Sequence, residues 1–190
     1  MDIKKIGKFL GIGLITVFVV ALAAMGFVFF DVMSYTATGS ENLNPDGSSN
    51  GNALVVYDPG ISGASKDIAM TIGKKLQSRG YTVRIAGIRS PVALNTSDYE
   101  YIVLGGPIYA GSASNSVKDY LKTLQSTSKT IGVFASGDDP DTAKNNATLL
   151  EEAAPLPENS SLQIKAVIKV VTSEGIDEQN INAFINQLLK

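Results

Sequence analysis

The stretch of the chain best suited to hold a planar ligand is a glycine-rich segment with one tyrosine. It runs from Gly105 to Gly111 (GGPIYAG) and directly follows an apolar run, Tyr101 to Leu104. Such a run is typical of a strand buried on both faces of a parallel sheet. Because Pro107 has no N–H to donate, we predict a loop beyond the strand, where ligands of open α/β sheets bind. The alternative is an ordinary connection with a buried Tyr109.

The composition restricts the chemistry that side chains can supply. The chain has 190 residues, no His and no Cys, and a formal net charge of −2 without a basic cluster. These totals exclude disulfides, thiolate chemistry, zinc sites with Cys or His ligands, and a Ser-His-Asp triad. They give no indication of nucleic-acid binding. We therefore predict neither a catalytic side-chain set nor a metal site, and expect redox chemistry only from a bound cofactor.

A second segment combines glycine and hydroxyl residues at the start of a predicted helix. The apolar run Ala53 to Tyr57 predicts a buried strand, and Asp58 to Ser65 (DPGISGAS) follows it. Apolar residues at helical spacing then continue to about Arg79. Backbone N–H groups at a helix start favour an anion, so the segment is a plausible phosphate cradle. The alternative is ordinary N-capping by Ser62 or Ser65.

A third segment follows another predicted buried strand, Thr130 to Ala135. It reads Ser136-Gly-Asp-Asp-Pro140 and leaves the carboxyl end of that strand. In a parallel sheet, this places it at the same edge as the two segments above. The alternative is a solvated turn that caps a helix beginning near Asp141.

These motifs resemble the flavodoxin family. The stretch DYEYIVLGGPIYAG matches the pattern of a strand entering a G-(S/G)-P-I-Y-x-G loop, and Ser65 to Ala69 resembles T-x-x-x-A. The resemblance covers about residues 53 to 190. The first loop departs from the family pattern: the Pro59-Gly60 region replaces an earlier hydroxyl residue, the loop is about one residue longer, and Asp58 adds a negative charge.

The resemblance implies FMN as the cofactor. In that family the loop after the central strand lies against the isoalloxazine ring, which makes Tyr109 the best stacking candidate here. The first loop would hold the phosphate and the third would line the other edge of the ring. The residues assigned to the cofactor in this way are Ser62, Gly63, Ala64, Ser65, Pro107, Ile108, Tyr109, Ala110, Gly111, Ser136 and Gly137.

The order of predicted elements indicates a doubly wound α/β fold. Strands and helices follow one another as β-α-β-β-α-β-α-β-α, which predicts five parallel strands in the flavodoxin-like order. The strands are expected at residues 53–57, 81–86, 101–104, 130–135 and 163–171, with the later helices at 117–124, 141–154 and 177–189. Residues 53–190 would form this domain.

The pattern of residues 1–52 predicts one transmembrane helix and a linker. Residues 1–8 contain three Lys, and residues 9–30 contain no charged residue. A helix of 9–30 would span about 33 Å, enough for a bilayer core of about 30 Å. We expect a retained signal anchor rather than a cleaved signal peptide or a buried core helix. Residues 31–52 have the composition of a flexible linker.

The charged residues on either side of the apolar run 9–30 predict the orientation of the chain in the membrane. Lys residues precede the apolar run, whereas none follows it until Lys66, so residues 1–8 are expected in the cytoplasm and the domain outside it. Asn-x-Ser/Thr triplets at Asn95, Asn146 and Asn159 are compatible with export.

The sequence thus predicts a membrane-anchored, FMN-binding electron-transfer protein with an unidentified redox partner. An electron carrier is preferred to a turnover enzyme. Two alternatives stay open: a flavin-dependent reductase of a small acceptor such as a quinone, and a flavin-free surface binding or structural module with the same fold.

Overall fold

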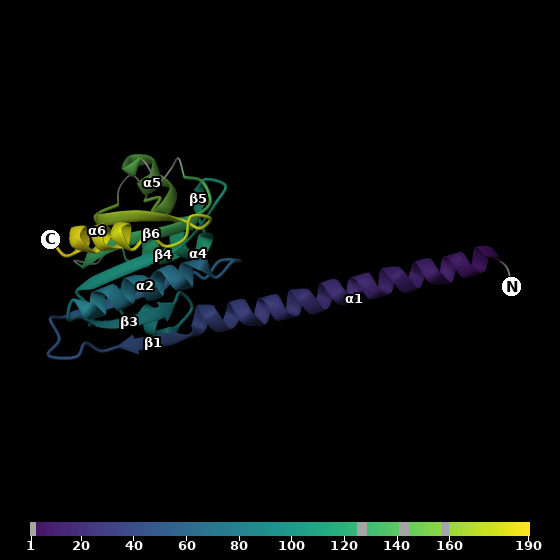
Figure 1. Ribbon diagram of the computed structural model, residues 1–190, viewed down its shortest axis with the longest axis horizontal. Coiled ribbons are helices and arrows are strands. Elements are labelled where there is room, and N and C mark those ends of the chain that lie inside the picture. The colour runs from purple at the N-terminus through teal and green to yellow at the C-terminus, as the bar shows by residue number, and fades with distance from the viewer. Residues whose placement is uncertain (1–2, 125–128, 141–144, 157–159) are drawn as a thin grey trace. The chain divides into compact units, whose positions relative to one another are not determined.

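The computed structural model describes residues 3–124, 129–140, 145–156 and 160–190. The chain divides into two units, Met1–Tyr35 and Thr36–Lys190. The elements, labelled in Figure 1, are α1 (Ile3–Thr38), β1 (Ser40–Leu43), β2 (Asn52–Tyr57), α2 (Ala64–Ser78), β3 (Thr82–Gly87), α3 (Pro91–Leu94), β4 (Tyr101–Tyr109), β5 (Ser112–Ala113), α4 (Asn115–Thr123), β6 (Thr130–Gly137), α5 (Asn146–Ala153), β7 (Ile164–Val171) and α6 (Glu178–Leu188).

The second unit is built on one sheet whose main path has the order β1-β3-β2-β4-β6-β7, with β5 paired to β4. The five strands from β3 to β7 along this path are parallel to one another. Their order is 2-1-3-4-5 when counted along the chain, which is the flavodoxin-like order. The predicted doubly wound fold is confirmed.

The predicted number of strands is wrong, because the described sheet has seven. β1 and β5 add to the parallel core, and both pair antiparallel with their neighbours. β1 has the sequence SENL and lies at the exposed edge of the sheet beside β3. An edge strand with one solvated face needs no apolar run, so the hydrophobic pattern gave no signal for it.

The expectation of a flexible linker from 31 to 52 does not hold for its middle part. α1 continues to Thr38, and β1 follows after one residue. Further along, Gln77 Nε2 donates to the carbonyl oxygen of Asn44 at 2.6 Å, and Asn50 Nδ2 donates to that of Arg79 at 2.9 Å. The part of the predicted linker from β1 to Asn50 is therefore held to the domain by hydrogen bonds at several points.

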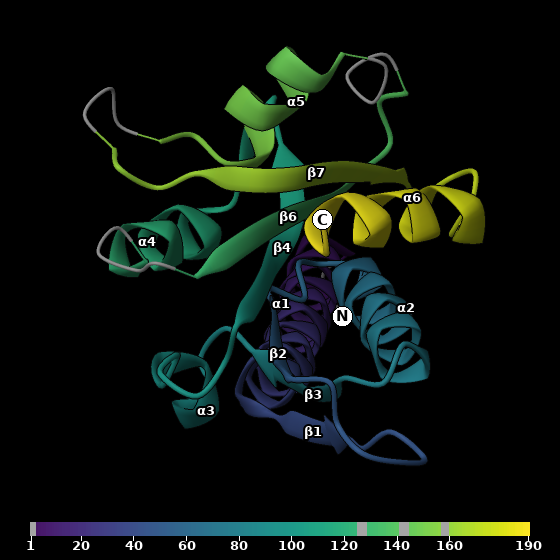
Figure 2. The same cartoon turned by 90° about the vertical axis from the view of Figure 1, so that its left-hand side faces the viewer.

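Helices cover both faces of the sheet. Figure 2 shows α2 and α6 on one side and α3, α4 and α5 on the other. α2 buries a face made by Ile68, Ile72 and Leu76, whose spacing is that of one side of a helix. α6 does the same with Ile181, Phe184, Ile185 and Leu188. Each set packs on uninterrupted apolar residues of the central strands.

The opposite face contains a buried tyrosine. The Tyr120 hydroxyl, on α4, donates to the carbonyl oxygen of Ala93 on α3. Burial raises the pKa of the Tyr120 phenol well above the ordinary tyrosine value. Tyr120 therefore stays neutral over the physiological pH range and ties the short helix α3 to the core.

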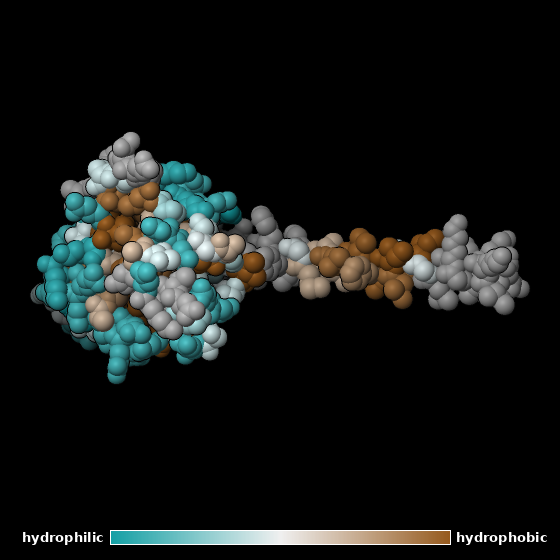
Figure 3. All heavy atoms as spheres, turned by 90° about the horizontal axis from the view of Figure 1, so that it is seen from above, coloured by the Kyte–Doolittle hydropathy of each residue, from teal (hydrophilic) through white to brown (hydrophobic). Residues whose placement is uncertain are grey.

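The first unit consists of α1 up to Tyr35. Its described side chains are mostly apolar, as the brown colouring in Figure 3 indicates, and they are exposed from Gly11 to Gly26. Within the described residues, the structure contains no helix whose length and apolarity suffice to cross a membrane.

Candidate functional site

Three segments at the carboxyl edge of the sheet meet, as the sequence predicts. The backbone N–H of Ile61 donates to the Tyr109 hydroxyl at 3.1 Å, which joins the β2–α2 connection to the end of β4. The hydroxyls of Ser65 and Ser136 lie 2.8 Å apart, which joins the start of α2 to the end of β6. The segment between β2 and α2 thus contacts the other two segments through side-chain hydrogen bonds.

The β2–α2 connection is folded around the buried Asp58. One carboxylate oxygen of Asp58 accepts from the backbone N–H of Gly60 at 3.1 Å, and the other accepts from the Ser114 hydroxyl at 2.6 Å. Gly60 has a φ of 62° and lies so close to β4 that an added Cβ would be 2.9 Å from Pro107 Cγ. Only glycine adopts this conformation at low cost. Asp58 therefore fixes the shape of the loop.

The start of α2 offers unsatisfied backbone donors. Gly63 occupies the N-cap position with a φ of 75° and provides no side-chain cap, so neither Ser62 nor Ser65 is the N-cap residue. The Ser62 hydroxyl accepts from the N–H of Ala64 at 3.3 Å. In the described part of the chain, no acceptor faces the N–H groups of Ser62, Gly63 and Ser65. An added Cβ on Gly63 would contact nothing, so the space before these groups is open.

The predicted loop 105–111 is largely strand. β4 continues to Tyr109, and a two-residue turn, Ala110-Gly111, leads into β5. The turn residues have φ angles of 49° and 75°. Positive φ at both central positions is the geometry of a type I′ hairpin. Tyr109 is 46% exposed, so the alternative of a buried tyrosine is also wrong.

Pro107 lies inside the central strand β4, contrary to the prediction. β2 ends at Tyr57, which pairs with Gly105. The carbonyl of Gly105 accepts from Asp58 N–H at 2.8 Å on that side of β4. Hydrogen-bonding groups of alternate strand residues point to the same side. The side of Pro107 that would carry an N–H therefore points past the end of β2. Its absence removes no hydrogen bond from the ladder between β2 and β4.

The third segment is tied to β7. Asp138 accepts a hydrogen bond from the Thr172 hydroxyl, just beyond the end of β7. Lys169, which is buried on β7, packs along Gly137, where an added Cβ would lie 3.3 Å from Lys169 Cε. Sequence reasoning missed Lys169 and Ser114, because neither belongs to a motif. The expected cap near Asp141 lies outside the described residues, and α5 begins instead after Asn145, which caps it.

The residues assigned to the cofactor differ in accessibility. Eight of the eleven assigned residues are exposed or half-buried, and the other three are buried. The exposed ones are Ser62, Tyr109, Ala110 and Gly111; the half-buried ones are Gly63, Ala64, Ile108 and Gly137; the buried ones are Ser65, Pro107 and Ser136. The hydroxyls of Ser65 and Ser136 face each other behind the loops. Their hydrogen bond holds the start of α2 against the end of β6 beneath the proposed site.

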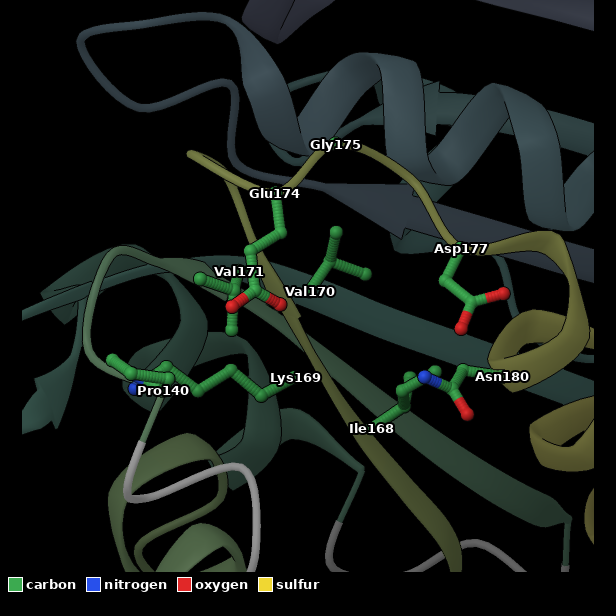
Figure 4. Close-up of a pocket in the computed structure, with 9 residues that line it drawn as sticks. All are labelled: Pro140, Ile168, Lys169, Val170, Val171, Glu174, Gly175, Asp177 and Asn180. Atoms are coloured by element: carbon green, nitrogen blue, oxygen red, sulfur yellow. The ribbon is translucent and has the colours of Figure 1, made fainter.

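A separate pocket of about 590 Å³ lies beside the third segment. Figure 4 shows its wall, formed by the second half of β7, the connection after it and the first turn of α6. Pro140 and Lys169 line it, but the eleven residues assigned to the cofactor do not. No sequence motif indicated this pocket.

Comparisons with known proteins agree with this architecture. No curated protein matches the chain. Among solved structures, it is similar to a flavo-di-iron protein mutant from Thermotoga maritima (19% identity, TM-score 0.53), with 77% of this chain aligned and only 36% of that protein spanned. It is also similar to a short-chain flavodoxin associated with a PDU bacterial microcompartment (24% identity, TM-score 0.55, 73% of this chain and 96% of that one). A third similar structure is flavodoxin 2 from Bacillus cereus (20% identity, TM-score 0.50, 73% and 97%).

At these identities the structural matches show a shared fold. The family follows from the sequence itself, because the sequence model of the flavodoxin domain matches residues 55–184, more than half of the chain. This range includes all three segments of the carboxyl edge. The chain therefore belongs to the flavodoxin domain family.

Proposed function

We propose that this chain is a membrane-anchored protein that binds FMN at the carboxyl edge of its sheet and transfers electrons. The observation that carries the proposal is the meeting of three segments that are far apart in the sequence. They are joined by the bonds from Ile61 to Tyr109 and between Ser65 and Ser136. The carboxyl edge of an open α/β sheet is where such folds bind ligands.

The phosphate of FMN fits the start of α2. The N–H groups of Ser62, Gly63 and Ser65 have no acceptor in the described chain, and the space before Gly63 is open. The positive end of the helix dipole adds to their attraction for an anion. The Ser62 hydroxyl is exposed and can donate to the phosphate while it accepts from Ala64.

The ring fits beside the hairpin. Tyr109 is exposed next to Ala110 and Gly111, and its hydroxyl is held by Ile61 N–H. This bond fixes the position of the hydroxyl end of the side chain before a ligand arrives. Aromatic stacking contributes about 0.5–1.5 kcal/mol beyond the burial of area. Gly137 would line the other edge. FMN would supply the redox chemistry that this chain, without His and Cys, lacks.

The proposed lipid attachment rests on residues 9–30, which contain no charge and follow three Lys. Large apolar side chains of α1 within this run, such as Leu14, Val17 and Phe18, are at least 62% exposed. Apolar surface on this scale needs lipid or protein to cover it. With the Lys residues in the cytoplasm, the domain would lie outside it. Protease added to intact, wall-stripped cells should then remove the domain, whereas degradation only after lysis would contradict this orientation.

A flavin-free binding module is the second candidate. The specific observation in its favour is that two loop donors are already satisfied within the protein: Gly60 N–H by Asp58 and Ile61 N–H by Tyr109. The Asp58 carboxylate also adds a negative charge to the loop that leads to the proposed phosphate site, which opposes an anion.

Calorimetric titration with FMN and riboflavin separates the two candidates. The full chain in detergent should bind FMN more tightly than riboflavin, because riboflavin has no phosphate for the α2 donors. The Gly63→Ala variant, with a Cβ in the open space, should lose FMN affinity and keep most of its riboflavin affinity. Gly175→Ala is the matched control, since Gly175 has a φ of 81° and equally open surroundings on another connection.

The outcomes are distinct. Equal affinity of the wild-type chain for both flavins would remove the phosphate site from the account. Binding of neither would favour the flavin-free module. An equal loss of FMN affinity in the Gly63→Ala and Gly175→Ala variants would show that the loss comes from backbone strain and not from a blocked phosphate site.

A further inference from the structure

The chain enters its second unit at the carboxyl edge of the sheet. β1 runs antiparallel to β3, so its first residue, Ser40, pairs with Ala86 near the end of β3. Just before β1, the carbonyl of Gly39 accepts from Gly87 N–H at 2.9 Å, and the carbonyl of Ala37 accepts from Arg89 N–H at 2.8 Å. These bonds fix residues 37–39 beside the end of β3, on the same edge as the proposed flavin site.

Exposed apolar side chains gather on the same edge. Among the described side chains of residues 37–190, four large apolar ones are exposed: Ile61, Leu94, Tyr109 and Ile176. Ile61 and Ile176 lie on the connections after β2 and β7, and Tyr109 is the last residue of β4. Ile61 is the most exposed of these three, at 68%. Three exposed large apolar side chains at one end of the domain are a candidate surface for contact with lipid or with a partner.

Chain connectivity limits what can cover this surface. Six residues lie between Phe30, the last residue of the apolar run, and Ala37, so the two Cα atoms are seven residue steps apart. Seven fully extended steps span at most about 25 Å, and seven helical steps span about 10 Å. A domain of this length is roughly 40 Å across, from its expected radius of gyration. The tether is therefore shorter than the domain, so the edge that holds Ala37 stays near whatever holds residues 9–30.

We propose that the carboxyl edge of the domain rests on the surface of the lipid bilayer, with Ile61, Tyr109 and Ile176 at the interface. This inference rests on the lipid attachment in the proposed function, but not on the flavin. The acidic side chains of the same edge, including Asp138 and Glu174, are exposed and stay in the hydrated headgroup layer. The contact is thus shallow, and it suits lipid without net charge. The proposed flavin then opens toward the membrane.

Because the chain has no Trp, a single introduced Trp reports its own surroundings. The Ile61→Trp and Ile176→Trp variants of the full chain place it on the carboxyl edge. Asp98→Trp is the matched control: Asp98 is exposed, and its carbonyl accepts from the side chain of Asn52, at the opposite end of β2. Each variant is reconstituted in phosphatidylcholine vesicles with or without bromine on the acyl chains, which quenches nearby Trp emission. Flotation measures attachment, and thermal melting checks folding.

The expected result is flotation of all three variants, loss of emission in brominated vesicles for Ile61→Trp and Ile176→Trp, and unchanged emission for Asp98→Trp. Flotation with no quenching at either edge position, or with stronger quenching at Asp98→Trp, would overturn the inference and leave the lipid attachment standing. Failure of every variant to float would overturn the attachment and the inference together. The two edge reporters are independent, so one variant that fails to fold leaves the other to decide.

Discussion

The hydrogen bond between Ser65 and Ser136 gives the sharpest test of how the site is supported. Ser65 is fully buried and Ser136 is 4% exposed, with their hydroxyl oxygens 2.8 Å apart. Ser65→Ala leaves the Ser136 hydroxyl buried without this partner, and an unsatisfied buried group costs about 1–3 kcal/mol. For a domain of this size, the melting temperature should fall by roughly 2–12 °C. Ser136→Ala should have a similar effect.

The double variant distinguishes this bond from a role in holding phosphate. Removing both hydroxyls leaves no orphaned group, so the double variant should be nearly as stable as the wild type. A double-mutant cycle by urea unfolding should give a coupling of about 2–6 kcal/mol, the sum of the two single losses that the double variant avoids. FMN affinity should change little in any of the three variants, because neither hydroxyl faces the open space before Gly63. Additive destabilisation, or a loss of FMN affinity specific to Ser65→Ala, would refute this reasoning.

Three further predictions follow from other contacts. Burial raises the pKa of Tyr120, so the folded state holds this proton more tightly than the unfolded state; stability should decline as the pH rises above about 10, and Tyr120→Phe should flatten that decline in urea unfolding at several pH values. Gly60→Ala should lower stability by about 1–2 kcal/mol, because its φ of 62° strains any L residue and the added Cβ presses on β4; an unchanged melting temperature would contradict this geometry of the loop. A chain that begins at residue 52 should melt below one that begins at residue 36, because it lacks β1; equal melting would show that β1 adds no stability.

Sequence reasoning found the parallel core and the meeting of its loops for physical reasons. Strands buried on both faces, such as Tyr101 to Leu104, are continuous apolar runs that stand out from their surroundings. Once those strands are parallel, their carboxyl-end connections must lie at one edge. The proximity of Ile61, Tyr109, Ser65 and Ser136 is a consequence of that topology.

The features that sequence reasoning missed depend on tertiary contacts. The polar strand β1 is defined by its pairing with β3, about forty residues later in the chain. The hairpin after Tyr109 needs a positive φ at Ala110, a conformation that alanine rarely takes. The inward direction of Ser65 is set by how α2 is rotated against β6. The bond from Ser114 to Asp58 joins residues 56 positions apart.

Reversible reduction of bound flavin tests the central proposal most directly. The full chain in detergent is loaded with FMN, freed of excess, and titrated anaerobically with a chemical reductant and then an oxidant while its visible spectrum is recorded. We expect the flavin spectrum to bleach and return, with the FMN still bound after the cycle and no turnover with a reduced nicotinamide. Rapid turnover with nicotinamide and a small acceptor would indicate a reductase instead. A chain that retains no FMN would contradict the account.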